Sequence, residues 1–568
     1  MNRLLLVLII FFAFFLRVFA IDVIPVGFTP DEASFGYDAY SILKTGKDQW
    51  GHSFPLVLES FGDFKTPLYA YLTIPSIALF GLNKFSVRLP NALLGTIAIY
   101  VTYLFVSELQ KNTTKQSSVN HDKSLAMISA TLLAISPWHI MMSRGAFEAN
   151  LSTFFLPLGG YFFLKGLTYP KYLLASSLIF GVNLFSYHSA RLVTPMVVLF
   201  LLFLYRNDLR KVSLTIIWKP IVIFAAFTIL ALYTLFIGGA TRAKDISIFS
   251  GALEEASEDR ILAIYQGLDT KTARLFHNKY ETVMERFLSN YLQYFSPSFL
   301  FTNGPAEATY GMIPGRGVLY WFELPLILGF IYALSTHKKK TSLFFILFWI
   351  LVSPIPAALT TGRGYAANRA TLMMPALQIA LGYGAVEVSK LFKNRFSKRI
   401  VKLLPLAYLS LLLIFLIPFL EDYYLLTPFK SAKEMLYGNL EAATWLKSNI
   451  STQKEVVISR SLSEPQIYVA FANKWDPWDY QEETQSWSIY KKNKLLFVDQ
   501  LPEYRLGKYT FRSINYSTDQ GSSDTFFVGK PEEFPLDAPI VKQFNYLTGT
   551  PAVVIVQPEG KVYAQKIF

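Results

Sequence analysis

Two adjacent carboxylates, Asp31 and Glu32, follow the first apolar segment of the chain. A polytopic membrane protein places its first extracytoplasmic loop at such a position, so both groups are expected at a membrane surface. Carboxylates there can abstract a proton from a hydroxyl group or orient a ligand. The same pair could also be an ordinary helix cap or a loop ion cluster. The segments around the pair must decide between these interpretations.

The composition is typical of a membrane protein. The chain has 568 residues, of which 52% are hydrophobic and 16% aromatic, and its mean hydropathy is +0.33. One soluble core needs less apolar material. The net charge of +13 comes from Lys and Arg residues in short runs between apolar segments, which indicates membrane topology and argues against a nucleic-acid-binding face. The absence of cysteine excludes disulfides, thiolate nucleophiles and cysteine-ligated metals.

The positive charges predict the orientation of the apolar segments. Basic runs occur near residues 111–123, 165–171, 206–211, 338–340 and 390–402. If these runs face the cytoplasm, we expect about 11 transmembrane helices, a cytoplasmic N-terminus and an extracytoplasmic C-terminus. This count requires that Pro67 to Phe80 does not cross the membrane, because the segment is short for a span and better suits an interfacial or re-entrant position. Residues 4–20 are expected to be a retained anchor rather than a cleaved signal.

The predicted fold is a polytopic α-helical membrane protein with a C-terminal extracytoplasmic α/β domain. Residues 1–420 form the transmembrane domain, with large outward loops at 22–87 and 239–316; the second loop is expected to cap a site at the outer surface. From about residue 421 the chain becomes polar, with short β-type runs at 455–459 and 552–556 and a helical pattern over 438–447. These features predict a soluble α/β domain at 421–568.

Five arginines lie near the outward ends of the predicted helices: Arg144, Arg191, Arg316, Arg363 and Arg369. Topology disfavours positive charge on this side, so an anion is expected to hold them. A guanidinium group binds phosphate oxygens in a bidentate manner, and a lipid phosphate would lie at this depth. Each arginine alone could instead reach the lipid headgroups or pair with a carboxylate. Several together, near acidic residues, favour a pocket.

Asp63 and Lys65 lie later in the first outward loop. Lys65 could neutralise a departing phosphate, and Asp63 could hold a sugar hydroxyl or a metal. A helix cap with a surface ion pair is an equally good interpretation of this segment alone.

Glu148 begins the apolar segment that follows Arg144, so its carboxylate is expected at membrane depth. A carboxylate there is a functional candidate. An ion pair with Arg144, four positions earlier, is the simpler alternative. His188 precedes Arg191 in another outward turn, where a structural, hydrogen-bonded histidine is more common than a metal ligand. Oxygen and nitrogen ligands for a divalent cation could come from Asp31, Glu32, Asp63, Glu148 and His188, although no spacing requires a metal.

The order of these elements resembles the GT-C membrane glycosyltransferases. More narrowly, it is similar to the superfamily of protein O-mannosyltransferases and aminoarabinose transferases. The resemblance covers roughly residues 1–420 and rests on Asp31-Glu32, on Lys65-Thr66-Pro67-Leu68 and on the Ser143–Glu148 element, supported by residues 87–95, 185–191 and 367–369. The family often has Lys-Pro-Pro or His-Pro-Pro where this chain has Lys65-Thr66-Pro67, which leaves the local backbone and any metal ligand there open.

The resemblance implies a bacterial plasma-membrane enzyme that uses a polyprenyl-phosphate-linked sugar and a protein, lipid or glycan acceptor. Asp31 and Glu32 would be catalytic, with Asp31 as the general base in one inverting displacement. Substrate binding would involve Asp63, Lys65, Arg144, Glu148, His188, Arg191 and Arg369. The transferred group would be a hexosyl or pentosyl residue.

Two other classes of protein share this architecture. A transporter or flippase would line mid-membrane positions with its ionisable groups, whereas those of this chain gather at the outward ends of the predicted helices. A noncatalytic scaffold of cell-envelope glycan assembly would tolerate loss of the acidic pair.

Overall fold

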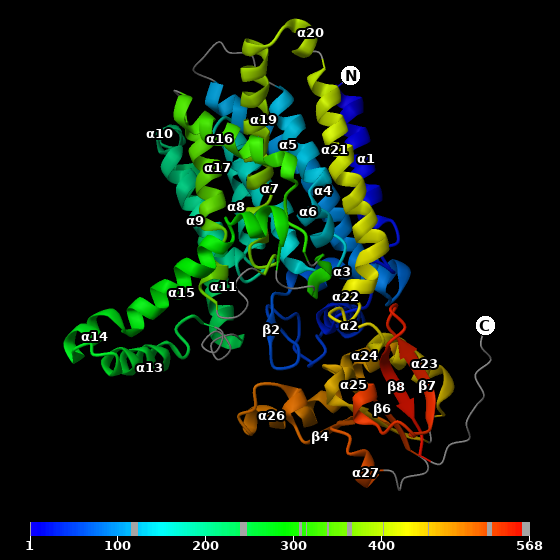
Figure 1. Cartoon of the computed structure of the whole chain (residues 1–568). Coiled ribbons are helices and arrows are strands. Elements are labelled where there is room, and N and C mark those ends of the chain that lie inside the picture. Colours follow the sequence, from blue (N-terminus) through cyan, green and yellow to red (C-terminus); the bar gives the residue numbers. More distant parts are fainter. Residues whose placement is uncertain are drawn as a thin grey trace. The chain divides into compact units, whose positions relative to one another are not determined.

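The computed structural model describes residues 2–114, 123–238, 247–305, 309–313, 315–337, 340–360, 366–401, 403–451, 454–519 and 525–558 (Figure 1). The described residues form two compact units. The first unit draws on Met1–Phe19, Asn91–Ser143 and Phe147–Leu420, and the second on Ala20–Pro90, Arg144–Ala146 and Glu421–Phe568. Each unit is therefore assembled from segments that are distant in the sequence.

The first unit consists of helices. Its longer helices are α1 (Asn2–Val18), α4 (Lys84–Thr114, which begins in the second unit), α5 (Lys123–Ile135), α7 (Ser152–Gly166), α8 (Tyr172–Asn183), α9 (Ala190–Leu204), α11 (Leu214–Gly238), α13 (Ala252–Tyr265), α15 (Lys279–Gln293), α16 (Leu324–Thr336), α17 (Thr341–Val352), α19 (Ala376–Arg395) and α21 (Leu404–Glu421). Short helices and turns connect them: α6 (Pro137–Met142), η1 (Glu148–Leu151), α10 (Arg206–Leu209), α14 (Thr270–Phe276), η2 (Ser298–Thr302), η3 (Thr309–Gly311), η4 (Trp321–Glu323), α18 (Ile355–Ala358), η5 (Thr371–Met373) and α20 (Lys398–Val401).

Within the described residues, five helical segments are long and apolar enough to cross a membrane: Lys84–Asn112, Leu214–Phe236, Thr341–Ala358, Thr371–Arg395 and Arg399–Ser431. Shorter apolar helices occur at Leu68–Phe80, Ser124–Ile135, Tyr172–Asn183, Ala190–Leu204 and Trp321–Thr336. This pattern is that of a polytopic helical membrane protein. The count of about 11 transmembrane helices stays a prediction.

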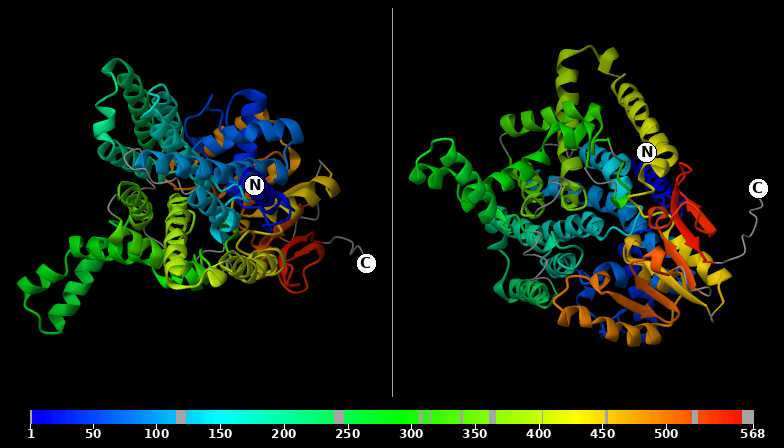
Figure 2. Two further views of the ribbon diagram at one scale, coloured as in Figure 1. Left: turned by 90° about the horizontal axis from the view of Figure 1, so that it is seen from above. Right: turned by 60° about the horizontal axis from the view of Figure 1, so that its bottom comes forward.

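Glycines allow helices α16 and α19 to approach closely. A Cβ atom on Gly384 of α19 would lie 1.7 Å from the carbonyl oxygen of Leu326 of α16, and one on Gly329 would lie 2.6 Å from the carbonyl oxygen of Gly384. Small residues permit such backbone contact between helices in membranes, where burial in lipid supplies little driving force. Elsewhere in this unit, α13, α14 and α15 form an arm that projects from the other helices (Figures 1 and 2).

The second unit contains a six-stranded sheet of order β4-β5-β3-β6-β8-β7. The strands are β3 (Glu455–Ser459), β4 (Glu503–Leu506), β5 (Tyr509–Arg512), β6 (Thr525–Gly529), β7 (Ile540–Asn545) and β8 (Pro551–Val556). Strand β3 runs parallel to β5 and β6, and the other pairs are antiparallel. The two predicted β-type runs thus form β3 and most of β8.

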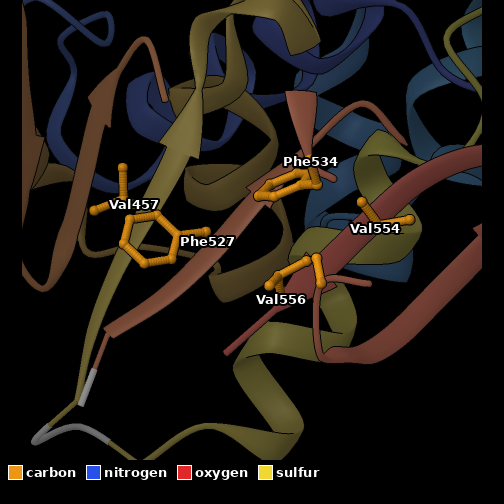
Figure 3. Packing of buried hydrophobic residues seen from close by; sticks show 6 residues of the cluster. Val457, Phe527, Phe534, Val554 and Val556 are labelled. Atoms are coloured by element: carbon orange, nitrogen blue, oxygen red, sulfur yellow. The ribbon is translucent and has the colours of Figure 1, made fainter. Parts of the chain in front are cut away.

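One side of this sheet packs against a small apolar core. Val457 of β3, Phe527 of β6, and Val554 and Val556 of β8 cluster with Phe534 (Figure 3). All five side chains are at most 9% exposed. Because alternate residues of a strand point to the same face, Val554 and Val556 lie on the face of β8 that contacts this cluster, while Val553 and Ile555 are buried on the opposite face.

Helices connect and flank the strands of the second unit. They are α22 (Thr427–Ser431), α23 (Asn439–Asn449), α24 (Pro465–Asn473), α25 (Pro477–Trp487), α26 (Ile489–Lys492) and α27 (Tyr516–Asp519), with short turns η6 (Asp422–Leu426), η7 (Arg460–Leu462), η8 (Val498–Gln500) and η9 (Pro531–Glu533). The helical pattern predicted over residues 438–447 corresponds to α23.

The first outward loop belongs to the same compact unit as this sheet. It contains α2 (Pro30–Thr45), α3 (Leu68–Phe80) and the two-stranded hairpin of β1 (Leu58–Glu59) and β2 (Phe64–Lys65). Helix α2 packs against both α3 and α24. The sequence places 22–87 in a domain of residues 1–420, and that division stays a prediction.

Candidate active site

The acidic pair lies in the first turn of α2. Thr29 is the N-cap: its hydroxyl accepts the backbone N–H of Glu32 at 3.3 Å, and the Glu32 carboxylate accepts the N–H of Thr29 at 3.2 Å. Pro30 fits the first helical position because its missing N–H would have no partner there. This reciprocal arrangement is a capping box. The helix-cap interpretation is therefore correct for Glu32.

Glu32 is buried and paired with an arginine. Arg88, near the start of α4, donates from Nε to Oε1 at 2.8 Å and from Nη2 to Oε2 at 3.0 Å. Both side chains are fully buried. Such a planar, bidentate pair fixes the geometry of both groups. The N–H of Ala146 also donates to Oε1 of Glu32, at 3.0 Å.

Arg88 also holds the chain that leads into α2. Its guanidinium group donates to three backbone carbonyls, those of Ile21 at 3.0 Å, Pro25 at 2.9 Å and Gly27 at 2.8 Å. With the two bonds to Glu32, its donors are satisfied by protein groups. Arg88 thus connects α4, the segment before α2 and the first turn of α2.

Asp31 has a different environment from its neighbour. Its side chain is 45% exposed, and its Oδ1 lies 2.6 Å from the ammonium group of Lys65, which is only 7% exposed. Lys65 ends β2, and its Nζ lies 5.0 Å from the ring centroid of Phe35 and 5.4 Å from that of Phe61. The aromatic rings and the carboxylate together stabilise the buried cation. The result is an accessible carboxylate beside a buried positive charge.

Asp63 and Arg144 hold the backbone near this pair. Asp63 accepts the N–H of Phe64 through Oδ1 at 2.8 Å, in the turn of the β1–β2 hairpin. Arg144 is buried and donates from Nη2 to the carbonyl of Ile24 at 2.9 Å. Its guanidinium carbon lies 4.9 Å from the ring centroid of Tyr424. The second unit therefore brings Asp31, Glu32, Lys65 and Arg144 together.

The other predicted site residues lie in the first unit. Glu148 begins η1, and Arg369 donates from Nη1 to the hydroxyl of Thr360 at 2.7 Å. Ser189, between His188 and Arg191, donates its hydroxyl to the Arg369 carbonyl at 3.2 Å.

Two further contacts draw these segments together. Turn η1 packs against η5, which follows Arg369, and Ser152 and Ser186 share a hydrogen bond of 2.8 Å. The segments that carry Glu148, His188, Arg191 and Arg369 are therefore neighbours.

Two outward arginines of the prediction remain. Arg316 donates to the carbonyl of Pro418 at 3.4 Å. Arg363 lies outside the described residues.

A divalent cation finds no prepared site in the part of the chain that the structure describes. No group of three or more His, Asp or Glu side chains there could hold a metal ion. Lys65 pairs with Asp31, and Arg88 pairs with Glu32. Fixed cations of this kind can stabilise a negative charge that develops during a reaction, as a metal ion would.

Two charged residues of this site were not predicted from the sequence. Arg88 could have been found, because it is a charged residue in the first turns of the apolar helical segment Lys84–Asn112. Glu464 could not, because it lies in the polar C-terminal segment without a distinctive pattern. Burial raises the pKa of Glu464 to about 8, with a further contribution from Asp499.

The whole chain has the fold of a known class of membrane transferases. It matches a solved structure of ArnT from Cupriavidus metallidurans bound to undecaprenyl phosphate with a TM-score of 0.52 and 12% identity, over 97% of both chains. The apo state of the same protein matches with a TM-score of 0.50, at the same identity and coverage.

A family model adds sequence evidence. Residues 64–234 match the family described as dolichyl-phosphate-mannose-protein mannosyltransferase. No curated protein matches the chain in sequence. The fold and the family match confirm the predicted resemblance to the GT-C membrane glycosyltransferases. The matched range begins one residue before Lys65 and includes Arg88 and Arg144.

Proposed function

We propose that this chain is an inverting glycosyltransferase. It moves a sugar from a polyprenyl-phosphate donor to an acceptor hydroxyl at the outer face of the bacterial plasma membrane. The observation that carries the proposal is the contact of the half-exposed Asp31 carboxylate with the buried Lys65 ammonium group. A base and a fixed positive charge side by side suit attack by a hydroxyl on a sugar with an anionic leaving group.

Asp31 is the general base in this reaction. Its free carboxylate oxygen takes the proton of the acceptor hydroxyl as the acceptor oxygen attacks the anomeric carbon. The bond between that carbon and the phosphate oxygen breaks, and its electron pair leaves with the polyprenyl phosphate. A single displacement from the opposite face inverts the anomeric configuration.

Glu32 serves a different purpose from Asp31 in this proposal. Its capping box and its pair with Arg88 leave it buried and bonded. A carboxylate without access to solvent is poorly placed to take a proton from an incoming acceptor. We therefore assign Glu32 and Arg88 to positioning: they fix the first turn of α2 and so the backbone that carries Asp31.

Fixed cations compensate the charge of the departing phosphate. Lys65 contacts Asp31, and Arg144 of the same unit is a further candidate because a guanidinium group binds phosphate in a bidentate manner. Arg191 and Arg369 of the first unit stay candidates on the same chemical ground. The solved ArnT structure contains undecaprenyl phosphate, which supports a lipid phosphate as the ligand. Asp63, Glu148 and His188 are candidates for contacts with the sugar.

The substitution Asp31→Asn tests the base assignment. The amide keeps the size of the side chain and cannot take the proton, so sugar transfer should fall by roughly 10²–10⁴-fold. Transfer is measured in membrane vesicles with a radiolabelled polyprenyl-phosphate sugar. Thermal unfolding of the purified variant should match that of the wild type.

Asp22→Asn is the matched control, because Asp22 is an exposed carboxylate in the segment before α2. This variant should transfer sugar at the wild-type rate. Full transfer activity in Asp31→Asn would exclude Asp31 as the base. A transporter or a scaffold would show no transfer in any variant, the wild type included.

A further inference from the structure

The arm of α13, α14 and α15, which projects from the other helices of the first unit (Figures 1 and 2), carries an exposed apolar stripe. On α15 the stripe consists of Tyr280, Met284, Leu288 and Leu292, which recur at every fourth position. Residues at this spacing lie along one face of a helix. Their exposed fractions range from 46% to 84%, so the protein itself covers little of this face.

The polar face of α15 is the one that packs inside the arm. Arg286 lies opposite the stripe, because it is two residues from both Met284 and Leu288 and each helical residue turns the chain by about 100°. Its Nη1 donates to the carbonyls of Ile248 and Ser250, both at 2.8 Å, and its Nη2 pairs with a carboxylate of α13. A soluble helical hairpin has the reverse arrangement, with apolar faces inside and polar faces in water. The arm is therefore built for an apolar medium outside it.

The other two helices of the arm show the same preference. The buried residues of α13 and α14 are small: Ala252, Ala256 and Ala273. Their exposed residues include large apolar ones: Leu253, Ile261, Leu262, Tyr265, Leu275 and Phe276. Burial of large apolar side chains is the main source of stability in water. Large exposed apolar patches accordingly mark surfaces that contact another molecule or a membrane.

Both ends of the arm are bonded to the end of Thr341–Ala358, one of the segments that are long and apolar enough to cross a membrane. Before α13, the N–H of Ile248 donates to the carbonyl of Leu359 at 3.2 Å. Near the end of α15, the side-chain amide of Asn290 donates to the carbonyl of Thr360 at 3.2 Å. Because a spanning helix ends near the membrane surface, the base of the arm lies at that surface.

The apolar stripe also continues onto the spanning segment. The hydroxyl of Tyr291 donates to the carbonyl of Leu351 of α17 at 2.7 Å. The Leu351 side chain is exposed, as is that of Leu292, the residue after Tyr291. An exposed leucine on a membrane-spanning helix faces lipid. The stripe of α15 is thus joined to a surface that lipid already covers.

The charges of the arm indicate which kind of attraction would hold it there. Residues 252–293 carry seven carboxylates and five lysine or arginine side chains. A slightly acidic segment gains nothing from the negative potential of anionic lipids. Burial of apolar side chains must therefore supply the binding energy.

We propose that the arm lies in the membrane–water interface, with the apolar stripe of α15 inserted into the lipid. Amphipathic helices of this kind bury their apolar face about 5–10 Å into the boundary between headgroups and acyl chains. The ligand of the arm is the lipid surface itself. This inference goes beyond the proposed transfer reaction and does not depend on it.

The test measures where the stripe lies relative to the lipid. The chain contains no cysteine, so Leu288→Cys provides a single site for an environment-sensitive fluorophore. The full-length protein is placed in phosphatidylcholine nanodiscs, whose two faces are both open to solvent. A lipid with a nitroxide near its headgroup should quench the fluorescence more strongly than one with a nitroxide near the bilayer centre, and aqueous iodide should quench it little. Met284→Cys should behave in the same way.

Ser289→Cys is the matched control, because Ser289 is an exposed residue on the polar side of the same helix. Its label should be quenched by iodide more than by the lipids. All three variants replace exposed side chains, so their melting temperatures should match that of the wild type.

Two results would overturn the inference. If iodide quenches the labels at positions 284 and 288 as strongly as the label at 289, the arm lies in water. If neither iodide nor the labelled lipids reach positions 284 and 288, a second copy of the chain or another protein covers the stripe. Both results leave the transfer reaction untouched, because no readout here involves sugar transfer.

Discussion

At the scale of residues, two neighbouring carboxylates have been given different environments. Asp31 is 45% exposed beside one cation, whereas Glu32 is fully buried and pairs with Arg88 in two bonds. A base that takes a proton from an incoming acceptor must be reachable, and a residue that sets its position is best buried and bonded. The same residue types one position apart therefore suit two tasks.

The buried pair leads to a prediction about stability. Arg88→Ala leaves Glu32 as an uncompensated buried charge, which should lower the free energy of unfolding by about 3–5 kcal/mol. Thermal or denaturant unfolding of the detergent-solubilised protein measures this. Lys84→Ala is the comparison, since Lys84 and Glu441 form a partly exposed pair that should contribute about 1 kcal/mol or less. Equal losses in the two variants would contradict the assigned role of Arg88.

The sequence predicts a hydrogen bond between residues that are close in the chain more readily than one between residues that are far apart. Thr29 and Glu32 have the spacing of a capping box, so that bond could be predicted from four residues. The pairing of Glu32 with Arg88 joins residues 56 positions apart, and that with Ala146 joins residues 114 positions apart. Such pairs depend on how segments pack, which no local pattern contains.

At the scale of elements, the helix interfaces of the first unit depend on small residues. Gly384→Ala would bring a Cβ atom against the Leu326 carbonyl, so α16 and α19 must separate, at a cost of about 1–3 kcal/mol. Melting temperature measures the loss. Ser335→Ala, at an exposed position of α16, should leave the melting temperature unchanged. An unchanged melting temperature in Gly384→Ala would show that the two helices are not in backbone contact.

The elements differ in how far sequence pattern predicted them. Apolar runs indicated the long membrane-spanning helices, and β-branched runs indicated β3 and β8. The outward region 239–316 was expected to contain aromatic helices ending near Tyr294, and α15 ends at Gln293. The positive φ angles of Ser463 and Glu464 were not predictable, since neither residue type signals such an angle.

At the scale of the whole molecule, the composition predicts a polytopic membrane protein. It does not predict which segments of the chain form each compact unit. Residues 20–90 share a unit with the C-terminal sheet, although hundreds of residues separate them. Grouping of this kind arises from long-range packing such as that of α2 on α24. It gives the C-terminal segment a direct part in shaping the surroundings of Asp31.

The central claim is that one displacement assisted by Asp31 transfers the sugar. The most direct test is the anomeric configuration of the product, measured by NMR after wild-type enzyme has used a polyprenyl-phosphate sugar of known configuration. A single displacement predicts a product of inverted configuration. A product that retains the configuration of the donor would require a covalent or front-face mechanism, and would contradict the account.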